Sequence, residues 1–374
     1  MSSTALPRPP DTGVGDWLAK AHLDLWLTLL IAAVCAVGLL VLYSASGHSI
    51  DMVWSQAQRM VFGAVVMVLC AHAPPEVYRA LAPWFYAITI VLLLLVFFLG
   101  DESKGARRWL NLGVVRFQPS ELMKLGMPLA VAAFLHGRYL PPRFTTVLVT
   151  LGVIGLPTAL IAKQPDLGTA LVVVCAGGFA LYFSGWGWRW LATIVAAVGA
   201  ATPVAWHYLH EYQRQRVLTF LSPERDPLGA GYHITQSKIA IGSGGLFGKG
   251  WMQGTQAHLD FLPESHTDFI FAVYAEEFGL LGVTLLLALY LAIVGRGLTI
   301  ALRGQDTFQR LLGGALSLTF FLYVFINIGM VIGLLPVVGV PLPLISYGGT
   351  SMVSLLAGFG MLMSIHTHRK LISN

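Results

Sequence analysis

The sequence has little charge for its length. Only 11% of its 374 residues are Asp, Glu, Lys or Arg, whereas 56% are hydrophobic, and the mean hydropathy is +0.71. A soluble globular protein usually has about 25% charged residues, because a chain of this size needs polar side chains to cover its surface. The composition therefore excludes a soluble globule and predicts a polytopic membrane protein.

Cysteine is also scarce, and a cleavable signal peptide is not expected. Cys35, Cys70 and Cys175 fall in apolar runs, where a thiol packs as a small hydrophobic side chain, so we expect neither a disulfide nor a cysteine-bound metal. The N-terminus lacks a basic start and a small-residue cleavage site. The net charge of +5 is small and dispersed, so no nucleic-acid partner is expected.

Apolar runs of about 20 residues predict ten membrane-spanning helices. They lie near residues 23–46, 57–73, 77–99, 119–136, 144–162, 168–184, 189–208, 267–295, 308–333 and 344–366. The expected fold is all-α, with one transmembrane domain at 23–368 between short tails at 1–22 and 369–374. An even number of helices places both tails on one side. The longest loop, 209–266, joins helices seven and eight.

Charge in the short loops predicts the orientation. The side of the N-terminus carries Arg138, Arg143, Arg189, Arg296, Arg303, Arg310, Arg369 and Lys370. Because positive charge in short loops marks the cytoplasmic side, both tails should be cytoplasmic. The opposite side carries Lys104, Arg107, Arg108, Arg116, Arg214, Arg216, Arg225, Lys238 and Lys249, mostly in two long loops. The positive-inside rule does not explain these cations, so we expect the functional site on the outer face.

Two outer segments carry acidic residues next to apolar helices. In QPSELMKL, Pro119 suits the start of a helix and places Glu121 and Lys124 on one face, either as a local ion pair or as a pair that faces a cavity. In the break at residues 163–168, Asp166 either caps the next helix or lines a cavity at a broken backbone. The sequence leaves these alternatives open.

The long outer loop contains a glycine-rich run that resembles a phosphate-binding loop. A P-loop needs a glycine five residues before the Gly-Lys pair and Ser or Thr after it, but Ser243 and Gly250 occupy those positions. We therefore reject a nucleotide site and keep a weaker hypothesis, in which backbone N–H groups and Lys249 contact an anion. Residues 236–241 predict a short amphipathic surface helix.

The segment FLPESHTDFIFAVYAEEFG places ionisable groups at the start of the eighth helix. Ser265 and Asp268 have the spacing of an N-terminal capping box, which is one interpretation of Asp268. The other is a general base at the rim of a membrane cavity, with Glu264 and His266 beside it. Two further carboxylates, Glu276 and Glu277, should lie about 12 Å deeper along the helix. We expect them to be buried, hydrogen-bonded supports.

The last outer segment, NIGMVIGLLPVVGVPLPLISYGGTS at 327–351, has three prolines and no charge. Such a segment is predicted to enter the membrane zone without forming a regular helix, so it must be buried in protein or line a cavity.

Five motifs in order resemble the SEDS proteins (shape, elongation, division and sporulation), most closely the RodA branch of cell elongation. They are RRWLNLGVVRFQPSELMK, QPDLGTAL, PERDPLGAGYHITQSKIAIGSGGLFGKG, LPESHTDFIFAVYAEEFG and NIGMVIGLLPVVGVPLPLISYGGTS. The resemblance implies a peptidoglycan glycosyltransferase that polymerises lipid II at the outer face of the cytoplasmic membrane. A lipid II flippase and a non-catalytic scaffold remain as alternatives.

The resemblance also implies roles for individual residues and partners. Asp268 matches the family's essential carboxylate, and a cavity for donor or acceptor is expected to draw on Glu121, Lys124, Asp166, Arg107, Arg108, Arg214, Arg216, Lys249, Glu264 and His266. The implied partners are a class B penicillin-binding protein and other membrane proteins of the elongation complex. No ligand cluster in the sequence demands a metal, although a divalent cation, Mg²⁺ or Mn²⁺, could assist the pyrophosphate.

Overall fold

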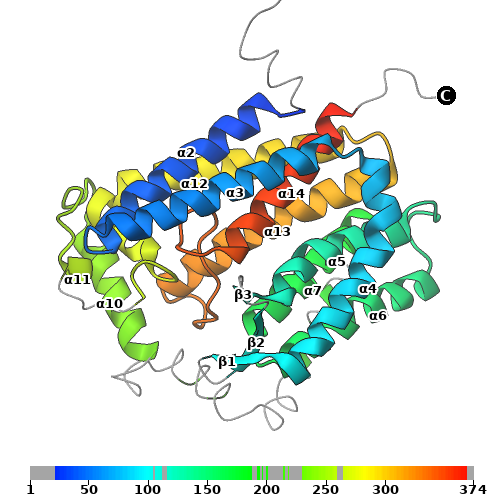
Figure 1. Cartoon of the computed structure of the whole chain (residues 1–374), viewed down its shortest axis with the longest axis horizontal. Coiled ribbons are helices and arrows are strands. Elements are labelled where there is room, and N and C mark those ends of the chain that lie inside the picture. The colour runs from blue at the N-terminus through cyan, green and yellow to red at the C-terminus, as the bar shows by residue number, and fades with distance from the viewer. Residues whose placement is uncertain are drawn as a thin grey trace, which may run out of the picture.

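The computed structural model is a bundle of long helices (Figure 1). It describes residues 22–103, 106–111, 116–187, 230–258 and 264–368, with isolated positions between 192 and 218. The helices are α2 (Leu25–Ala45), α3 (Ile50–His72), α4 (Pro75–Leu99), α5 (Pro119–Leu135), α6 (Phe144–Lys163), α7 (Leu167–Phe183), α10 (Ala230–Ser243), α11 (Thr255–His258), α12 (Ile270–Leu302), α13 (Thr307–Val331) and α14 (Thr350–Thr367).

Seven of these helices are long and apolar enough to cross a membrane, namely α2, α3, α4, α6, α12, α13 and α14. The 17-residue helices α5 and α7 occupy two further predicted spans. The predicted span at 189–208 falls largely outside the described residues. Nine of the ten expected spans are thus present as helices, and the prediction of a polytopic membrane protein is confirmed.

Three predicted boundaries were wrong. Helix α3 begins at Ile50 rather than 57, because the Ser49 hydroxyl accepts a hydrogen bond from the Met52 N–H and starts the helix earlier. Helix α14 begins at Thr350 rather than 344, after an irregular stretch. Helix α12 is longer than expected and is broken at Gly279, where φ is 61° and ψ is −164°.

The described part of the chain is not entirely helical. The segment before α5 forms a small antiparallel sheet of β1 (Asp101–Ser103), β2 (Ala106–Asn111) and β3 (Arg116–Phe117). Asp101 pairs with Trp109, and Leu110 pairs with Phe117. The all-α fold class is nevertheless confirmed, because this short sheet is the only strand structure among the described residues. Leu110 is buried and the next residue, Asn111, is exposed, as expected of a pleated strand whose side chains point to opposite faces.

Helices α13 and α14 form the interior of the bundle. In the 18-residue apolar stretches of α13 and α14, 72% and 61% of the residues are buried. In the corresponding stretches of the other five long helices, only 22–33% are buried. Those five helices expose many leucines, valines and phenylalanines, as expected for surfaces that face lipid. The inner pair positions the site described below.

Both described chain ends lie at the same end of the bundle (Figure 1). At this terminal end, Asp24 before α2 contacts Arg296 of α12 and His366 of α14. At the opposite end, which we call the site end, Ser44 of α2 contacts Glu277 of α12, and the three strands lie beyond α4 and α5. The described ends of α2, α12 and α14 thus gather at these two ends of the bundle, and the membrane side that each end faces stays a prediction.

Candidate functional site

The segment 264–269 approaches α12 as a turn rather than as helix. The helix begins at Ile270, its N-cap is Phe269, and no side chain caps it. The Ser265 hydroxyl instead donates to the Ala45 carbonyl at 3.0 Å, which ties the segment to the end of α2. The predicted capping box of Ser265 and Asp268 is therefore wrong, because Ser265 bonds to α2 and the helix begins two residues after Asp268.

Asp268 is held in place through its backbone by a buried asparagine. The Asn327 side chain, on α13, donates to the Asp268 carbonyl at 3.0 Å and to the Val340 carbonyl at 2.8 Å. The Asp268 Oδ2 atom lies 3.6 Å from where a Cβ on Gly339 would stand. The half-buried carboxylate thus packs against the irregular segment between α13 and α14.

This irregular segment, residues 332–349, is the central part of the predicted non-helical stretch at 327–351, whose two ends belong to α13 and α14, and its residues 342–346 are buried. Leu342, Leu344 and Ile345 are at most 1% exposed. The Ser346 hydroxyl donates to the Thr267 carbonyl at 2.6 Å, and the Tyr347 N–H donates to the His266 carbonyl at 3.0 Å. The segment and the turn that carries Asp268 therefore position each other.

His266 and Glu264 flank this contact. The His266 ring lies 6.1 Å from the Tyr347 ring, centroid to centroid. Glu264 is exposed, has a positive φ of 57°, and its carboxylate accepts from the Thr267 hydroxyl at 2.8 Å. The structure thus brings both predicted neighbours close to Asp268 in the same turn, whereas Phe261 to Pro263 lie outside the described residues.

Glu121 and Lys124 form a buried ion pair at the start of α5. The Lys124 Nζ atom lies 2.6 Å from Glu121 Oε1, and the two side chains are 7% and 8% exposed. Ser354 of α14 donates to Glu121 Oε2 at 3.2 Å, and Lys124 Nζ lies 5.0 Å from the centre of the Tyr323 ring. The predicted pair on one helix face is confirmed.

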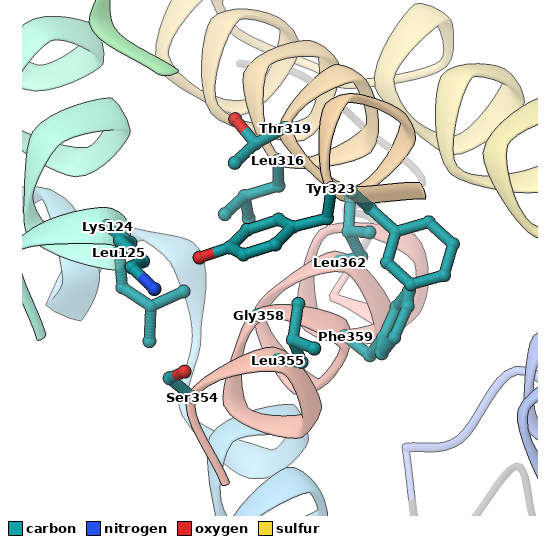
Figure 2. Close-up of a pocket in the computed structure, with 11 residues that line it drawn as sticks. Lys124, Leu125, Leu316, Thr319, Tyr323, Ser354, Leu355, Gly358, Phe359 and Leu362 are labelled. Carbon is teal, nitrogen blue, oxygen red and sulfur yellow. The ribbon is translucent and has the colours of Figure 1, made fainter. Parts of the chain in front are cut away.

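Lys124 of the pair also lines a cavity between α5, α13 and α14 (Figure 2). The space not filled by atoms is about 400 Å³ including its open mouth, and apolar side chains such as Leu316 and Phe359 form most of its wall. Figure 2 shows the Tyr323 hydroxyl directed toward Lys124, with Ser354 below. The local ion pair is therefore confirmed, and Lys124 is the member of the pair that lines the cavity.

Asp166 caps α7 and joins it to the segment before α5. Its Oδ1 accepts from the Thr169 N–H at 3.2 Å, and its Oδ2 accepts from the Gln118 side chain at 3.0 Å. Arg108 of β2 donates to the carbonyls of Gln164 and Pro165 in the same break. The cap is confirmed, and the break is held by polar contacts from the small sheet.

The glycine-rich run of the long loop closes over the break in α12. Four backbone hydrogen bonds connect them: Lys249 N–H to Glu276 C=O at 3.0 Å, Gly250 N–H to Glu277 C=O at 3.0 Å, Leu280 N–H to Gly245 C=O at 2.9 Å and Leu281 N–H to Leu246 C=O at 3.1 Å. These bonds satisfy groups that lose their helical partners at Gly279. The hypothesis that N–H groups of this run bind an anion is therefore wrong for Lys249 and Gly250.

Glu276 and Glu277 are buried and hydrogen-bonded, but they are not deep. Glu276 accepts from Lys249 Nζ at 2.6 Å and from the Thr255 N–H at 3.0 Å, both in the long loop. Glu277 accepts from the Ser44 hydroxyl, one residue before the end of α2. The predicted depth was wrong, because these contacts hold both carboxylates beside the end of α2 and the long loop, at the site end.

The remaining predicted cations are only partly described. Arg107 lies in β2, where its backbone pairs with Glu102, and Arg214 occupies an isolated helical position. Arg216 lies outside the described residues. The predicted surface helix at 236–241 is confirmed as part of α10, which packs against α12 and α13.

Sequence reasoning missed several polar residues in apolar helices. Asn327, Tyr323 and Ser354 all face the site end from the inner helices α13 and α14. In the sequence, each of them is a single polar residue within an apolar helix. This pattern is not specific, because many such side chains form hydrogen bonds only to the backbone of their own helix. Among the described residues, no group of three or more His, Cys, Asp or Glu is arranged to hold a metal ion.

Comparison with known proteins identifies the family. Residues 25–371 match the model of the FtsW, RodA and SpoVE family, described as cell cycle protein. The chain is 55% identical over 355 residues to the peptidoglycan glycosyltransferase MrdB of Escherichia coli K12, covering 95% of this chain and 96% of that one. It is 36% identical to MrdB of Helicobacter pylori J99, over 94% and 92% of the two chains.

Solved structures agree with this assignment. A chain of a peptidoglycan synthase complex, studied for its coordination of polymerization and crosslinking, matches with a TM-score of 0.82 and 34% identity, over 93% of this chain and 99% of that one. The rod shape determining protein RodA of Thermus thermophilus matches with a TM-score of 0.71 and 31% identity, over 93% and 98%. The fold and these matches agree, and the chain belongs to the FtsW, RodA and SpoVE family, which is the SEDS family its motifs resemble.

Proposed function

We propose that this protein is a peptidoglycan glycosyltransferase that polymerises lipid II into glycan strands during cell elongation. The observation that carries the proposal is Asp268, a half-buried carboxylate at the site end whose backbone is fixed by Asn327. Relatives that match over nearly the whole chain are named for this activity. A buried ion pair and an apolar cavity near the same end provide a polar and an apolar surface for a lipid-linked sugar.

In the proposed reaction, Asp268 acts as the general base. Its carboxylate removes the proton from the acceptor sugar hydroxyl, whose oxygen attacks the anomeric carbon of the donor. The bond from that carbon to the pyrophosphate breaks, the polyprenyl pyrophosphate leaves with the electron pair, and the anomeric centre is inverted. Cationic side chains stabilise the leaving group, and the candidates are Lys124, Arg107, Arg108, Arg214 and Arg216.

Lys124 and Lys249 are weaker candidates for that role than the arginines, because their ammonium groups are paired with Glu121 and Glu276. We further propose that any divalent cation, Mg²⁺ or Mn²⁺, is held largely by the phosphates of the substrate. Polymerisation that stops in EDTA and resumes on addition of Mg²⁺ would support this, and unchanged polymerisation in EDTA would oppose it.

The same proposal sets the orientation and the partners. The terminal end would face the cytoplasm, because Arg138, Arg143, Arg296 and Arg303 are near it, and the site end would face the periplasm. The substrate is lipid II. A class B penicillin-binding protein, with other membrane proteins of the elongation complex, is the proposed partner, since one structural relative comes from a peptidoglycan synthase complex.

The test is polymerisation of lipid II by the purified protein, alone and with its transpeptidase. The wild-type protein should form glycan chains, and Asp268→Asn should form none while it remains folded. Movement of lipid II across vesicles without polymer would instead identify a flippase. No polymer and no lipid II movement, with the transpeptidase still recruited, would identify a scaffold.

A further inference from the structure

Arg59 is a charged residue inside a membrane-spanning helix. It lies nine residues into α3, about 14 Å from the start of the helix at 1.5 Å per residue. A guanidinium group at that depth is costly unless it meets a partner or reaches a polar surface, because lipid tails cannot solvate it. Arg59 was not among the residues that the sequence singled out.

The contacts of Arg59 point to the irregular segment before α14. Its guanidinium carbon lies 4.4 Å from the centre of the Tyr347 ring. Its Cδ and Nε atoms lie 3.5 Å from where a Cβ on Gly349 would stand. A cation over an aromatic face is attracted to it but keeps its N–H donors available. Among the described residues, Arg59 forms no salt bridge to a carboxylate.

Residues next to Arg59 connect it to the turn that carries Asp268. One turn earlier on α3, the Gln56 side chain donates to the Ser346 carbonyl at 3.2 Å and accepts from the Gly348 N–H at 3.3 Å. Tyr347, which stacks against Arg59, bonds through its N–H to the His266 carbonyl, two residues before Asp268. Arg59 therefore contacts the segment that also fixes the turn of Asp268.

Arg59 also stands at the boundary between lipid and protein. Its neighbours Val61 and Phe62 are 65% and 60% exposed on the outer surface of α3, whereas Gln56 and Met60 are buried against the bundle. A lipid-linked molecule at this boundary could keep its hydrocarbon chain among the tails. Its polar head would then meet the Arg59 side chain and the irregular segment.

We infer that Arg59 binds a phosphate group at this boundary, and that the group is the diphosphate of the polyprenyl-linked donor. Arginine suits the task because its planar group donates two parallel hydrogen bonds to phosphate oxygens and stays charged. The first turn of α14, whose N-cap Gly349 offers no side-chain cap, adds backbone donors beside it. The inference rests on the proposed function, which brings a lipid-linked diphosphate to this face.

The experiment measures binding separately from polymerisation. Undecaprenyl diphosphate, phosphatidylglycerol and undecaprenol are each titrated into the detergent-purified full chain, and bound lipid is counted by native mass spectrometry. The variants are Arg59→Met, Arg59→Lys and the matched control Arg303→Met, an exposed arginine at the terminal end. The folding of each variant is checked by its melting temperature. If Arg59→Met does not fold, the binding measured for Arg59→Lys serves as the test.

We expect Arg59→Met to bind undecaprenyl diphosphate about tenfold more weakly. Arg59→Lys should bind with intermediate affinity, because lysine keeps the positive charge but cannot donate two parallel hydrogen bonds from a planar group. Arg303→Met should bind as tightly as the wild-type protein. Equal binding by all variants would overturn the inference. A loss confined to phosphatidylglycerol would also overturn it, since the site would then hold a phospholipid headgroup. If undecaprenyl diphosphate binding depends on Arg59 but the wild-type protein forms no polymer, the proposed function is refuted and the phosphate site at Arg59 stands.

Discussion

The two ends of the bundle use their charged residues in different ways. At the terminal end, charges pair across the ends of regular helices: Arg296 Nη2 lies 2.5 Å from Asp24 Oδ2, and Arg79 of α4 lies 3.4 Å from Asp306 before α13. Arg79 also contacts His136 at 2.8 Å, which joins α5 to the same cluster. These pairs connect elements that are far apart in the sequence.

At the site end, polar groups sit on or beside broken backbone. Asp268 lies in a turn, Asp166 lies at the break before α7, and the irregular segment 332–349 contacts both Arg59 and the turn of Asp268. The difference teaches that the terminal end uses charges to join regular helices, whereas the site end uses irregular backbone to position the carboxylate proposed to act on substrate, beside a buried ion pair within α5. Each prediction below tests one side of that contrast.

The largest stability effect is expected at the buried pair of the site end. Lys124→Met leaves the Glu121 carboxylate buried without its partner, which should destabilise the fold by about 3–5 kcal/mol. At the terminal end, Arg79→Met removes a partly exposed pair and should cost only about 0–1 kcal/mol. Melting of the detergent-purified variants, followed by intrinsic fluorescence, checks both.

A double variant separates structure from function at this pair. Glu121→Leu with Lys124→Met replaces both charges by apolar groups and should recover much of the lost stability. It should not recover polymerisation, because the cavity would lose its polar wall. Wild-type polymerisation by the double variant would show that the pair is purely structural.

The next effect concerns the loop that closes over Gly279. At Gly248, φ is +79° and a Cβ would lie 2.1 Å from the Glu277 carbonyl oxygen, so Gly248→Ala should displace the loop. Gly245 has a φ of +56° but no atom within 4 Å of such a Cβ. Gly245→Ala therefore carries the backbone strain alone, and its melting temperature should fall less. Equal losses would show that the close packing of Gly248 contributes nothing.

The third effect is an acid-dependent loss of stability at the terminal end. Burial raises the pKa of Asp24, but hydrogen bonds from Arg296 and from the Leu27 N–H, with the Arg296 and His366 charges, outweigh it and hold the pKa below its usual 3.8. A carboxylate whose pKa is lower in the folded protein than in the unfolded chain stabilises the fold at pH values above the unfolded pKa. This stabilisation is lost as the pH falls through the folded pKa.

Asp24→Asn should therefore cost about 1.5–3 kcal/mol at pH 7, the range for hydrogen bonds to charged groups. Below about pH 4 the difference from wild type should shrink. Melting temperatures between pH 3 and pH 7 test this. A constant difference over that range would contradict the assigned pairing.

The smallest effect is expected at His22, which stacks on His368 with ring centroids 4.4 Å apart. Burial lowers the pKa of His22 below its usual 6.5, and the charges of His368 and His72 lower it further. The unfolded chain then binds more protons just below pH 6.5, so folded stability falls as the pH drops through that value. His22→Gln should flatten this slope in melting experiments between pH 7 and pH 5.5. An unchanged slope would oppose it.

Periodicity and apolar run length were enough to place most helices. The segments 119–136 and 144–162 match α5 and α6 to within one residue, because a lipid-spanning helix must be apolar over most of its length. The start of α3 was missed because Asp51 and Gln56 interrupt the apolar pattern before residue 57. Those polar residues belong to a helix whose inner face contacts the irregular segment.

The contacts that organise the site could not be predicted from sequence. The glycine-rich run and Gly279 are about thirty residues apart, and nothing local in either shows that they share backbone hydrogen bonds. Asn327 looks like one polar residue in an apolar helix, yet it links Asp268 to Val340. Family motifs identified Asp268, but only the fold shows how its position is fixed.

The most direct test of the contrast between the two ends measures polymerisation rate and melting temperature together on two aspartate variants. Asp268→Asn should reduce the rate at least about 100-fold, the contribution of a general base, with an unchanged melting temperature. Asp24→Asn should lower the melting temperature but keep the rate per folded molecule. A wild-type rate in Asp268→Asn, or a lost rate with unchanged melting in Asp24→Asn, would contradict the account.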